Sequence, residues 1–117
     1  MTLALVIAPS AEADIDDILE WSAFRFDPAI RDGYEALIDA AITQLLDEPE
    51  RPGSHTPDRL RGQVRTYHLA AARDAVPGDV RRIEKPRHFV IYRVVGSELH
   101  VVRILHDALD LPRQYIP

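Results

Sequence analysis

Two apolar runs near the carboxyl-terminal end of the chain have the composition of β-strands. Residues 88–95 and 98–106 are rich in β-branched and aromatic residues, and only Gly96 and Ser97 separate them. A two-residue link with glycine first favours a type II′ turn, so the pattern predicts a β-hairpin. Both runs are apolar on both faces. We therefore expect the hairpin to lie centrally in a sheet, with each face covered.

The alternation of side chains across a strand predicts which hairpin residues share a face. Pairing Val95 with Glu98 sets the register of all the others. The face that we assign to packing against helices carries the pairs His88–Leu105, Val90–Arg103, Tyr92–Val101 and Val94–Leu99. The opposite face carries an apolar centre and a basic rim, formed by Phe89, Ile91, Val102 and Ile104 and by Arg93, His100 and His106. An apolar patch with a basic rim is typical of a partner-binding surface.

The amino-terminal half has helical spacing instead. Residues 3–7 predict a short strand that Pro9 ends, and Ser10 is expected to cap the helix that follows. The core stripe of this first helix is Ala11, Ile15, Ile18, Leu19 and Ser22. Asp27 and Pro28 predict the start of a second helix, because Asp suits the N-cap and Pro the first helical position. Its stripe is Tyr34, Leu37, Ile38, Ala41, Ile42 and Leu45, and it ends near Pro49.

The remaining segments complete a predicted α+β domain over residues 1–117. Residues 50–62 predict a loop and residues 64–69 a strand. Residues 70–86 fit either an extended hairpin or a mobile loop, and residues 108–117 form a tail with two prolines. The order β-α-α-β-β-β predicts an antiparallel sheet with a helical hairpin on one face. In that arrangement Tyr92, Val94, Leu99 and Val101 pack against Ile15, Ile18, Leu19, Leu37, Ile38 and Ala41.

Composition excludes several kinds of site. The 117 residues include no cysteine, so neither a disulfide nor a thiolate metal site can form, and we expect a reducing cytoplasm. No apolar run approaches the roughly 20 residues of a membrane span. The net charge of −5 is split, since residues 1–58 hold 3 basic and 13 acidic residues and residues 59–117 hold 11 and 6. This asymmetry predicts a dipolar surface that steers charged partners.

Three motifs occur in a fixed order along the chain. Pro9 to Ile18 matches the pattern P-x-A-E-x-D-hydrophobic-x-x-I, and Gly62 and Arg65 precede the second long strand. Residues 88–94 and 102–106, followed by Asp110, match an ending of the form "YRV … VRVLH". In this combination the chain resembles the ParE-type toxins of the RelE/ParE superfamily. The resemblance implies a toxin of a two-gene system, a cognate ParD-like antitoxin and a toxin–antitoxin hetero-oligomer. It implies inhibition of DNA gyrase for ParE members and ribosome-dependent mRNA cleavage for RelE members.

The chemistry of RNA cleavage separates these two activities. Attack by a 2′-hydroxyl needs a proton acceptor, a proton donor and cations for the phosphate. Nuclease relatives carry Arg three residues before the strand tyrosine, where this chain has Phe89, and some follow the last His with Tyr, where it has Asp107. Acidity also opposes docking on ribosomal RNA. We therefore expect a gyrase-inhibiting toxin that is not an enzyme. The alternatives are a nuclease that uses Arg93, Arg103, His106 and Tyr115, or a non-toxic interaction module.

The predicted binding residues follow from the outward hairpin face. We expect the antitoxin to cover it, in contact with Phe89, Ile91, Arg93, His100, Val102, Ile104 and His106. Arg103 is expected to point toward the helices and to pair with Asp14 or Glu12. Trp21 is either a packing residue or part of a contact surface. The five histidines lack helical i, i+4 spacing, and His88 and His106 are expected on opposite faces, so we expect no metal and no cofactor. We also expect no sequence-specific binding of nucleic acid.

Overall fold

A computed structural model of the chain describes residues 2–57 and 63–117; Gly62, quoted above, lies outside these residues. Its elements are β1 (Ala4–Ile7), α1 (Pro9–Arg25), α2 (Pro28–Asp47), β2 (Ser54–His55), β3 (Arg65–His68), the 3₁₀ helix η1 (Leu69–Ala75), β4 (His88–Val95), β5 (Glu98–His106) and the 3₁₀ helix η2 (Leu111–Arg113). Among the described helices, none is both long enough and apolar enough to cross a membrane.

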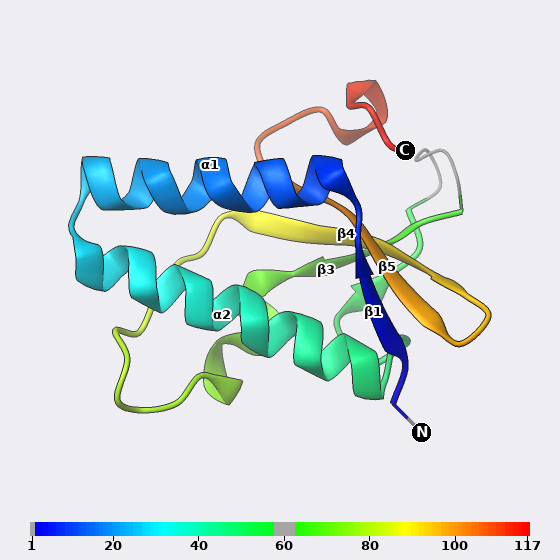
Figure 1. Cartoon of the computed structure of the whole chain (residues 1–117), viewed down its shortest axis with the longest axis horizontal. Helices are drawn as coiled ribbons and strands as arrows, with labels where there is room; N and C mark the ends of the chain where they lie inside the picture. Colours follow the sequence, from blue (N-terminus) through cyan, green and yellow to red (C-terminus); the bar gives the residue numbers. More distant parts are fainter. Residues whose placement is uncertain (1, 58–62) are drawn as a thin grey trace.

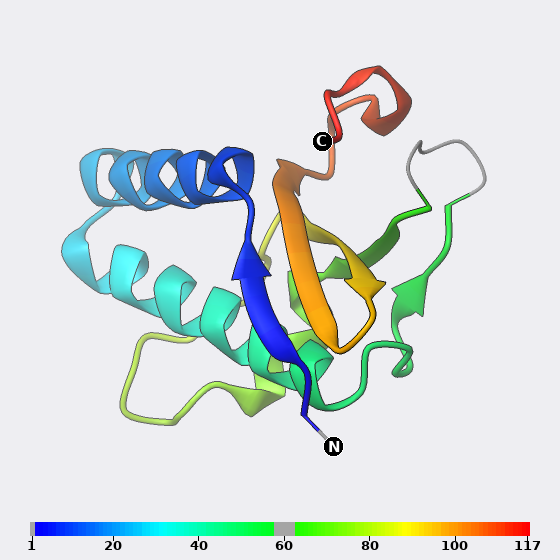
Figure 2. The same ribbon diagram turned by 45° about the vertical axis from the view of Figure 1, so that its right-hand side comes forward.

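The predicted α+β class is confirmed. One five-stranded sheet has the order β1-β5-β4-β3-β2, and the hairpin β4–β5 lies inside it. The helices α1 and α2 run antiparallel and cover one face (Figures 1 and 2). The sheet is mixed rather than wholly antiparallel, because β1 pairs parallel to β5 at the edge. The short strand β2 was not predicted; it lies inside the expected loop of residues 50–62. It pairs antiparallel with β3.

The two helices begin for different reasons. Asp27 caps α2 as predicted, since its side-chain oxygen accepts a hydrogen bond from the Ile30 N–H at 3.0 Å. The N-cap of α1 lies two positions before the predicted one. Ala8 is the N-cap and Pro9 the first helical residue, while the Ser10 hydroxyl donates to the Val102 carbonyl at 2.8 Å. The start of α1 is therefore attached to β5 instead of being capped by its own side chain.

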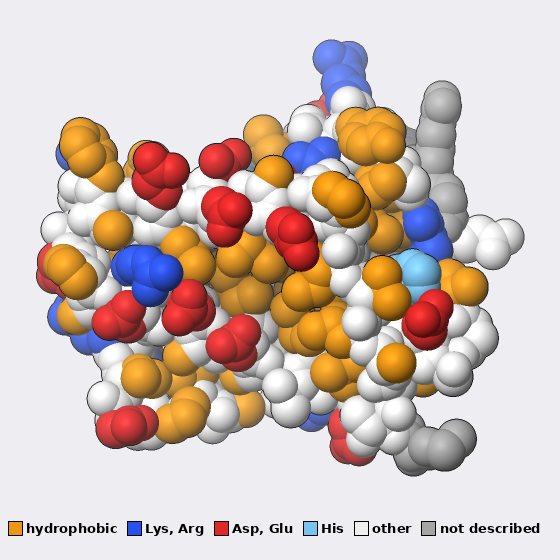
Figure 3. Space-filling view, viewed as in Figure 1, with side chains coloured by type: hydrophobic (Ala, Val, Ile, Leu, Met, Phe, Trp, Pro, Cys, Tyr) orange, Lys and Arg blue, Asp and Glu red, His pale blue; other side chains and the backbone are white. Residues whose placement is uncertain are grey.

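The helix stripes are buried as predicted. All six predicted stripe residues of α2 are buried, and in α1 Ala11, Leu19 and Ser22 are buried while Ile15 and Ile18 pack at the core boundary. The exception on the sheet is Val94, which is 42% exposed near the hairpin turn. On the outer side of α1 and α2, acidic side chains gather (Figure 3).

The predicted hairpin register is confirmed from the turn to the pair Tyr92–Val101 and is wrong beyond that pair. Gly96 has a φ of +60°, as the first position of a type II′ turn requires. The pairs from Val95–Glu98 to Tyr92–Val101 match the prediction. A β-bulge then inserts Val102 as an extra residue in β5, and the following pairs become Ile91–Arg103, Val90–Ile104, Phe89–Leu105 and His88–His106.

This bulge changes the face of four predicted residues. Since directly opposed residues share a face, Ile104 and His106 now lie on the helix side, whereas we predicted them on the outward side. Arg103 and Leu105 lie on the outward side, whereas we predicted them toward the helices. Ile104 joins the main core beneath the helices, and Leu105 joins a second cluster with Val64, Ile91 and Val102.

The segment after β3 contains no β-hairpin, one of the two predicted alternatives. It begins as η1, whose Leu69 and Ala72 are buried, and residues 76–87 continue as a loop, called the strap below, with a turn at Pro77 to Val80. Ile83 of this strap packs against the main core. Gly33 permits the contact with α2, because a Cβ atom there would overlap the Arg81 carbonyl oxygen.

Candidate functional site

The first feature of functional interest is the part of the β5 edge that β1 does not cover. Strand β1 pairs with β5 only as far as Val101, and Asp14 of α1 occupies the edge beyond it. The Asp14 carboxylate accepts hydrogen bonds from Arg103 Nε at 2.7 Å, from Arg103 Nη2 at 2.9 Å and from the Ile104 N–H at 2.9 Å. The hydrogen bonds to Asp14 raise the pKa of Arg103 above its ordinary value. The predicted ion pair is confirmed, and it occupies two of the five N–H donors of this arginine.

The outward face of the hairpin is covered by the carboxyl-terminal tail, residues 107–117. Leu111 and Ile116 of the tail pack against the second cluster, as does Phe89, and the cluster members Ile91 and Val102 are 0% and 3% exposed. Two arginines hold the tail by its backbone. Arg93 donates to the Pro117 carbonyl at 2.9 Å and Arg103 to the Tyr115 carbonyl at 2.8 Å. The apolar centre predicted for a partner is therefore in contact with the chain's own tail.

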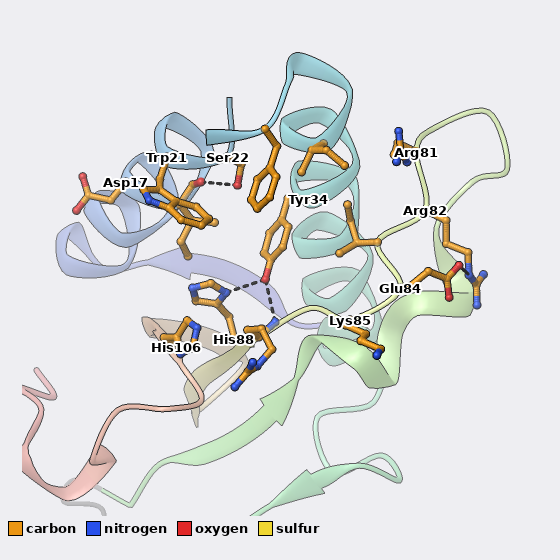
Figure 4. Close-up of a pocket in the computed structure, with 15 residues that line it drawn as sticks. Asp17, Trp21, Ser22, Tyr34, Arg81, Arg82, Glu84, Lys85, His88 and His106 are labelled. Carbon is orange, nitrogen blue, oxygen red and sulfur yellow. Dashed lines mark hydrogen bonds and ion pairs between the residues drawn. The ribbon is translucent and has the colours of Figure 1, made fainter. Parts of the chain in front are cut away.

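His88 and His106 form a pair at the far end of the hairpin. Contrary to our prediction they share one face, because the bulge makes them register partners, and their ring centroids lie 5.1 Å apart. The Tyr34 hydroxyl of α2 joins them. It accepts a hydrogen bond from the Arg87 N–H at 3.0 Å and lies 2.7 Å from His88 Nδ1 (Figure 4). Burial, with His106 nearby, lowers the pKa of His88 to about 4.

The hydrogen bonds constrain the two rings differently. The Tyr34 hydroxyl oxygen accepts from the Arg87 N–H and has a second lone pair, so its contact with His88 Nδ1 is compatible with either tautomer of His88. The Ala108 N–H donates to His106 Nδ1 at 3.0 Å, so a neutral His106 carries its proton on Nε2.

Asp107 anchors a neighbouring ionic network. Its carboxylate lies 2.9 Å from Arg87 Nη2 and 2.9 Å from His68 Nε2, and 3.7 Å from His106 Nδ1. The hydrogen bond from Arg87, supported by that from His68, lowers the pKa of Asp107 to about 2. The sequence indicated only that this anion follows His106. Nothing in the local pattern connected it with His68, which is 39 positions away.

The alternative catalytic set is divided between the two faces of the sheet. Arg93, Arg103 and the Tyr115 backbone meet on the outward face, and His106 lies on the helix side. His100 is in register with Arg93 and its Nε2 atom lies 3.1 Å from a Glu98 carboxylate oxygen. Over residues 2–57 and 63–117, no group of three or more potential metal ligands comes together.

Trp21 lies at the surface of the protein. It is 57% exposed and meets Phe26 edge to face, with ring centroids 5.4 Å apart. Its side chain borders a pocket between the helices and the end of β4, with Tyr34, His88 and His106 below it (Figure 4).

Comparisons with known proteins agree with this fold. A family model described as "ParE toxin of type II toxin-antitoxin system, parDE" matches residues 5–111. The structure "Chromosomal ParDE TA system from P. aeruginosa" contains a chain with a TM-score of 0.66 at 19% identity, over 90% of this chain and 96% of that chain. A copper-bound mutant toxin from Helicobacter pylori gives a TM-score of 0.54 at 22% identity, over 89% and 93%. At these identities the two likenesses establish the fold alone. No curated protein matches the sequence.

Proposed function

The chain belongs to the ParE toxin family of type II toxin–antitoxin systems, and we propose that it inhibits DNA gyrase by protein–protein contact and is neutralised by a cognate ParD-like antitoxin. Its target and its antitoxin would both be met in the cytoplasm. In this role the chain acts as a binding protein and not as an enzyme.

The division of the alternative catalytic set between the two faces of the sheet carries this proposal, because Arg93 and Arg103 lie on one face and His106 on the other. Cleavage of RNA needs a base and phosphate-binding cations on one surface. Here Arg103 is engaged by Asp14 and by the tail, and His106 lies on the other face beside an anion, Asp107. Phe89, at the position where nuclease relatives carry arginine, packs against His68 with ring centroids 4.9 Å apart. These contacts favour inhibition by contact over RNA cleavage.

Two assays with purified protein distinguish the activities. The protein should block the supercoiling of relaxed plasmid by gyrase and ATP, and it should leave mRNA intact on translating ribosomes. His106→Ala should retain gyrase inhibition, as should the matched variant His55→Ala, which changes an exposed histidine on β2. Unfolding curves establish that both variants are folded. Codon-specific mRNA cleavage that is lost in His106→Ala and kept in His55→Ala would contradict the proposal.

The tail covers the face on which we expect the antitoxin to bind, and this indicates how binding would occur. We propose that an antitoxin segment reaches Phe89, Ile91 and Val102 by displacing residues 107–117. Its backbone carbonyls or acidic groups would then take over the guanidinium donors of Arg93 and Arg103, which now hold the tail. The face predicted from the sequence would become accessible only when the antitoxin is present.

Weakening the tail tests this mechanism. Ile116→Ser removes one of the two apolar anchors and should tighten antitoxin binding several-fold in calorimetric titration, because less of the tail's contact is lost on binding. Leu109→Ser is the matched control, since Leu109 is 44% exposed and is not a member of the cluster. Equal antitoxin affinity for the parent and for Ile116→Ser would show that the antitoxin binds elsewhere.

A further inference from the structure

The turn between α1 and α2 carries three exposed aromatic side chains. Trp21, Phe24 and Phe26 are 57%, 89% and 59% exposed. Phe24 follows Trp21 by three positions, so the two are neighbours on the surface of α1. Phe26 meets Trp21 edge to face, with ring centroids 5.4 Å apart. The three rings form one apolar surface, called the aromatic patch below, and a cluster of this kind marks an interaction site.

One side of the aromatic patch is acidic. Asp16, Asp17 and Glu20 of α1 are exposed, and none of them makes an ion pair with a described residue. They outnumber Arg25, the one basic residue of this helix. Asp17 lies one helical turn before Trp21, so the carboxylates are next to the rings.

The other side of the patch is basic. Across the pocket from α1, the strap carries Arg81 and Lys85 (Figure 4). Both are exposed and have no ion-pair partner in the part of the chain that the structure describes. The remaining cations of the pocket rim are already paired, Arg82 with Asp74 and Glu84, and Arg87 with Asp107. The unpaired charges are therefore negative on α1 and positive on the strap.

A partner that complements this surface must carry the same two signs in reversed order. A uniformly acidic segment would meet the carboxylates of α1, and so would the phosphates of a nucleic acid. A uniformly basic segment would meet Arg81 and Lys85. A second copy of the chain satisfies the requirement by symmetry, because a two-fold axis parallel to the pocket places α1 of each copy against the strap of the other.

We propose that two copies of this chain associate through the aromatic patch, with α1 of each copy facing the strap of the other. The rings of both copies pack together at the centre, and the α1 carboxylates of each copy pair with Arg81 and Lys85 of the other at both edges. Burial of the rings supplies affinity, and the charges fix the orientation. The opposite arrangement, α1 against α1, would bring carboxylates together. The inference goes beyond the proposed function, because self-association requires neither gyrase nor an antitoxin.

The area of the patch suits a reversible dimer. An aromatic side chain has roughly 150–250 Å² of surface, so the exposed fractions of the three rings amount to roughly 400 Å² in each copy. Both copies together bury twice this area from the rings alone, and the flanking charged residues bring the total above the roughly 1,000 Å² of a specific interface. Interfaces at this lower end of the range are transient, so we expect association at micromolar concentrations.

Sedimentation velocity measures this association directly. The apparent mass should rise from 13.2 kDa to twice that value as the concentration increases through the micromolar range. The protein contains a single tryptophan, so the emission of Trp21 should shift to the blue over the same range. Phe24→Ser should weaken association about tenfold, whereas Leu109→Ser, a matched change in the tail, should not. A parent protein that stays at 13.2 kDa up to millimolar concentration would overturn the inference.

Paired charge reversals test the orientation. The α1 variant carries Asp17→Lys and Glu20→Lys, and the strap variant carries Arg81→Glu and Lys85→Glu. Each variant alone should associate at least about tenfold more weakly than the parent, because like charges then oppose each other at both edges of the dimer. An equimolar mixture of the two should form a heterodimer with nearly the affinity of the parent, because each edge again joins opposite charges.

A third variant controls for net charge. Asp47→Lys with Glu48→Lys makes the same change as the α1 variant at the far end of α2, where both residues are exposed. It should self-associate like the parent, and it should bind the strap variant no better than the parent does. Unfolding curves establish that all variants are folded.

The mixing experiment decides whether the arrangement is correct. No recovery of association in the mixture of α1 and strap variants would overturn it, as would equal recovery with the control variant. Failure of the gyrase assay with self-association intact would refute the proposed function alone, and gyrase inhibition by a protein that never dimerises would refute this inference alone.

Discussion

Replacing Asp14 with alanine should destabilise the domain strongly, although Asp14 lies near the surface of α1. The Asp14 carboxylate accepts three hydrogen bonds, two from Arg103 and one from the Ile104 N–H. The side chains of Asp14 and Arg103 are only 15% and 17% exposed. Substitution leaves a largely buried guanidinium without its counter-ion and a backbone donor on the edge of β5 without an acceptor.

The size of the effect follows from these two losses. Removing one partner of a buried ion pair costs about 3–5 kcal/mol, and an exposed pair contributes less than about 1 kcal/mol. An unsatisfied backbone N–H adds about 1–3 kcal/mol. For a pair that is mostly but not fully buried we expect about 3 kcal/mol in total. In a domain of this size that corresponds to roughly 10 °C in melting temperature.

Urea unfolding of five variants separates the contributions: Asp14→Ala, Asp14→Asn, Arg103→Ala, the double variant and Asp16→Ala. Asp14→Asn keeps an acceptor for Ile104 and should cost about half as much as Asp14→Ala. Combining Asp14→Ala with Arg103→Ala should give a coupling energy of about 2 kcal/mol. Asp16→Ala is the control on the same helix, because Asp16 is exposed and makes no ion pair with a described residue, and it should change stability by less than about 0.5 kcal/mol. A coupling energy below about 0.5 kcal/mol would refute the reasoning.

Two further predictions concern the strap and the buried histidine. Gly33→Ala should destabilise the fold by about 1–3 kcal/mol in urea unfolding, because its Cβ would overlap the Arg81 carbonyl oxygen. Gly78→Ala, with no atom within 4 Å of its Cβ, should be nearly neutral. The pKa of His88 is lowered from 6.5 to about 4, so the unfolded chain binds the extra proton and stability falls as the pH drops through that window. The loss should approach about 3 kcal/mol and be absent in His88→Asn. The stabilisation from Asp107, whose pKa is lowered from 3.8 to about 2, is lost only as the pH falls below 3.8, so it does not affect this window. Equal pH dependence in parent and variant would contradict the assignment.

Local sequence signals predicted the elements that local physics determines. The Asp27–Pro28 pair places a side-chain acceptor and a residue without an N–H where the first turn of a helix needs them. The spacing of Tyr34 to Leu45 identified a helix face that is buried in full. The Gly96–Ser97 link fixed the turn and the four pairs next to it. In each case the deciding interactions lie within a few residues of one another.

The bulge in β5 had no such signal. Val102 is a β-branched residue among others of the same kind, so the sequence of the strand does not distinguish it from its neighbours. Its position coincides with a change on the opposite edge of β5. Up to Val101 that edge pairs with β1, and beyond it Ser10 and Asp14 of α1 provide the partners. These contacts join residues about 90 positions apart. The periodicity of side chains within one strand therefore cannot reveal them.

One inserted residue therefore decides which chemistry the two faces can support. In an unbroken register His106 would stand on the outward face with Phe89 and Ile91, close to the cations that hold the tail. The bulge instead turns His106 toward the helices, where it meets His88 at the base of the aromatic pocket, and turns Arg103 outward, where Asp14 and the tail engage it. The bulge thus separates His106 from Arg93 and Arg103. The outward face is left with arginines that bind the backbone of the tail, and the inner end is left with an apolar cavity.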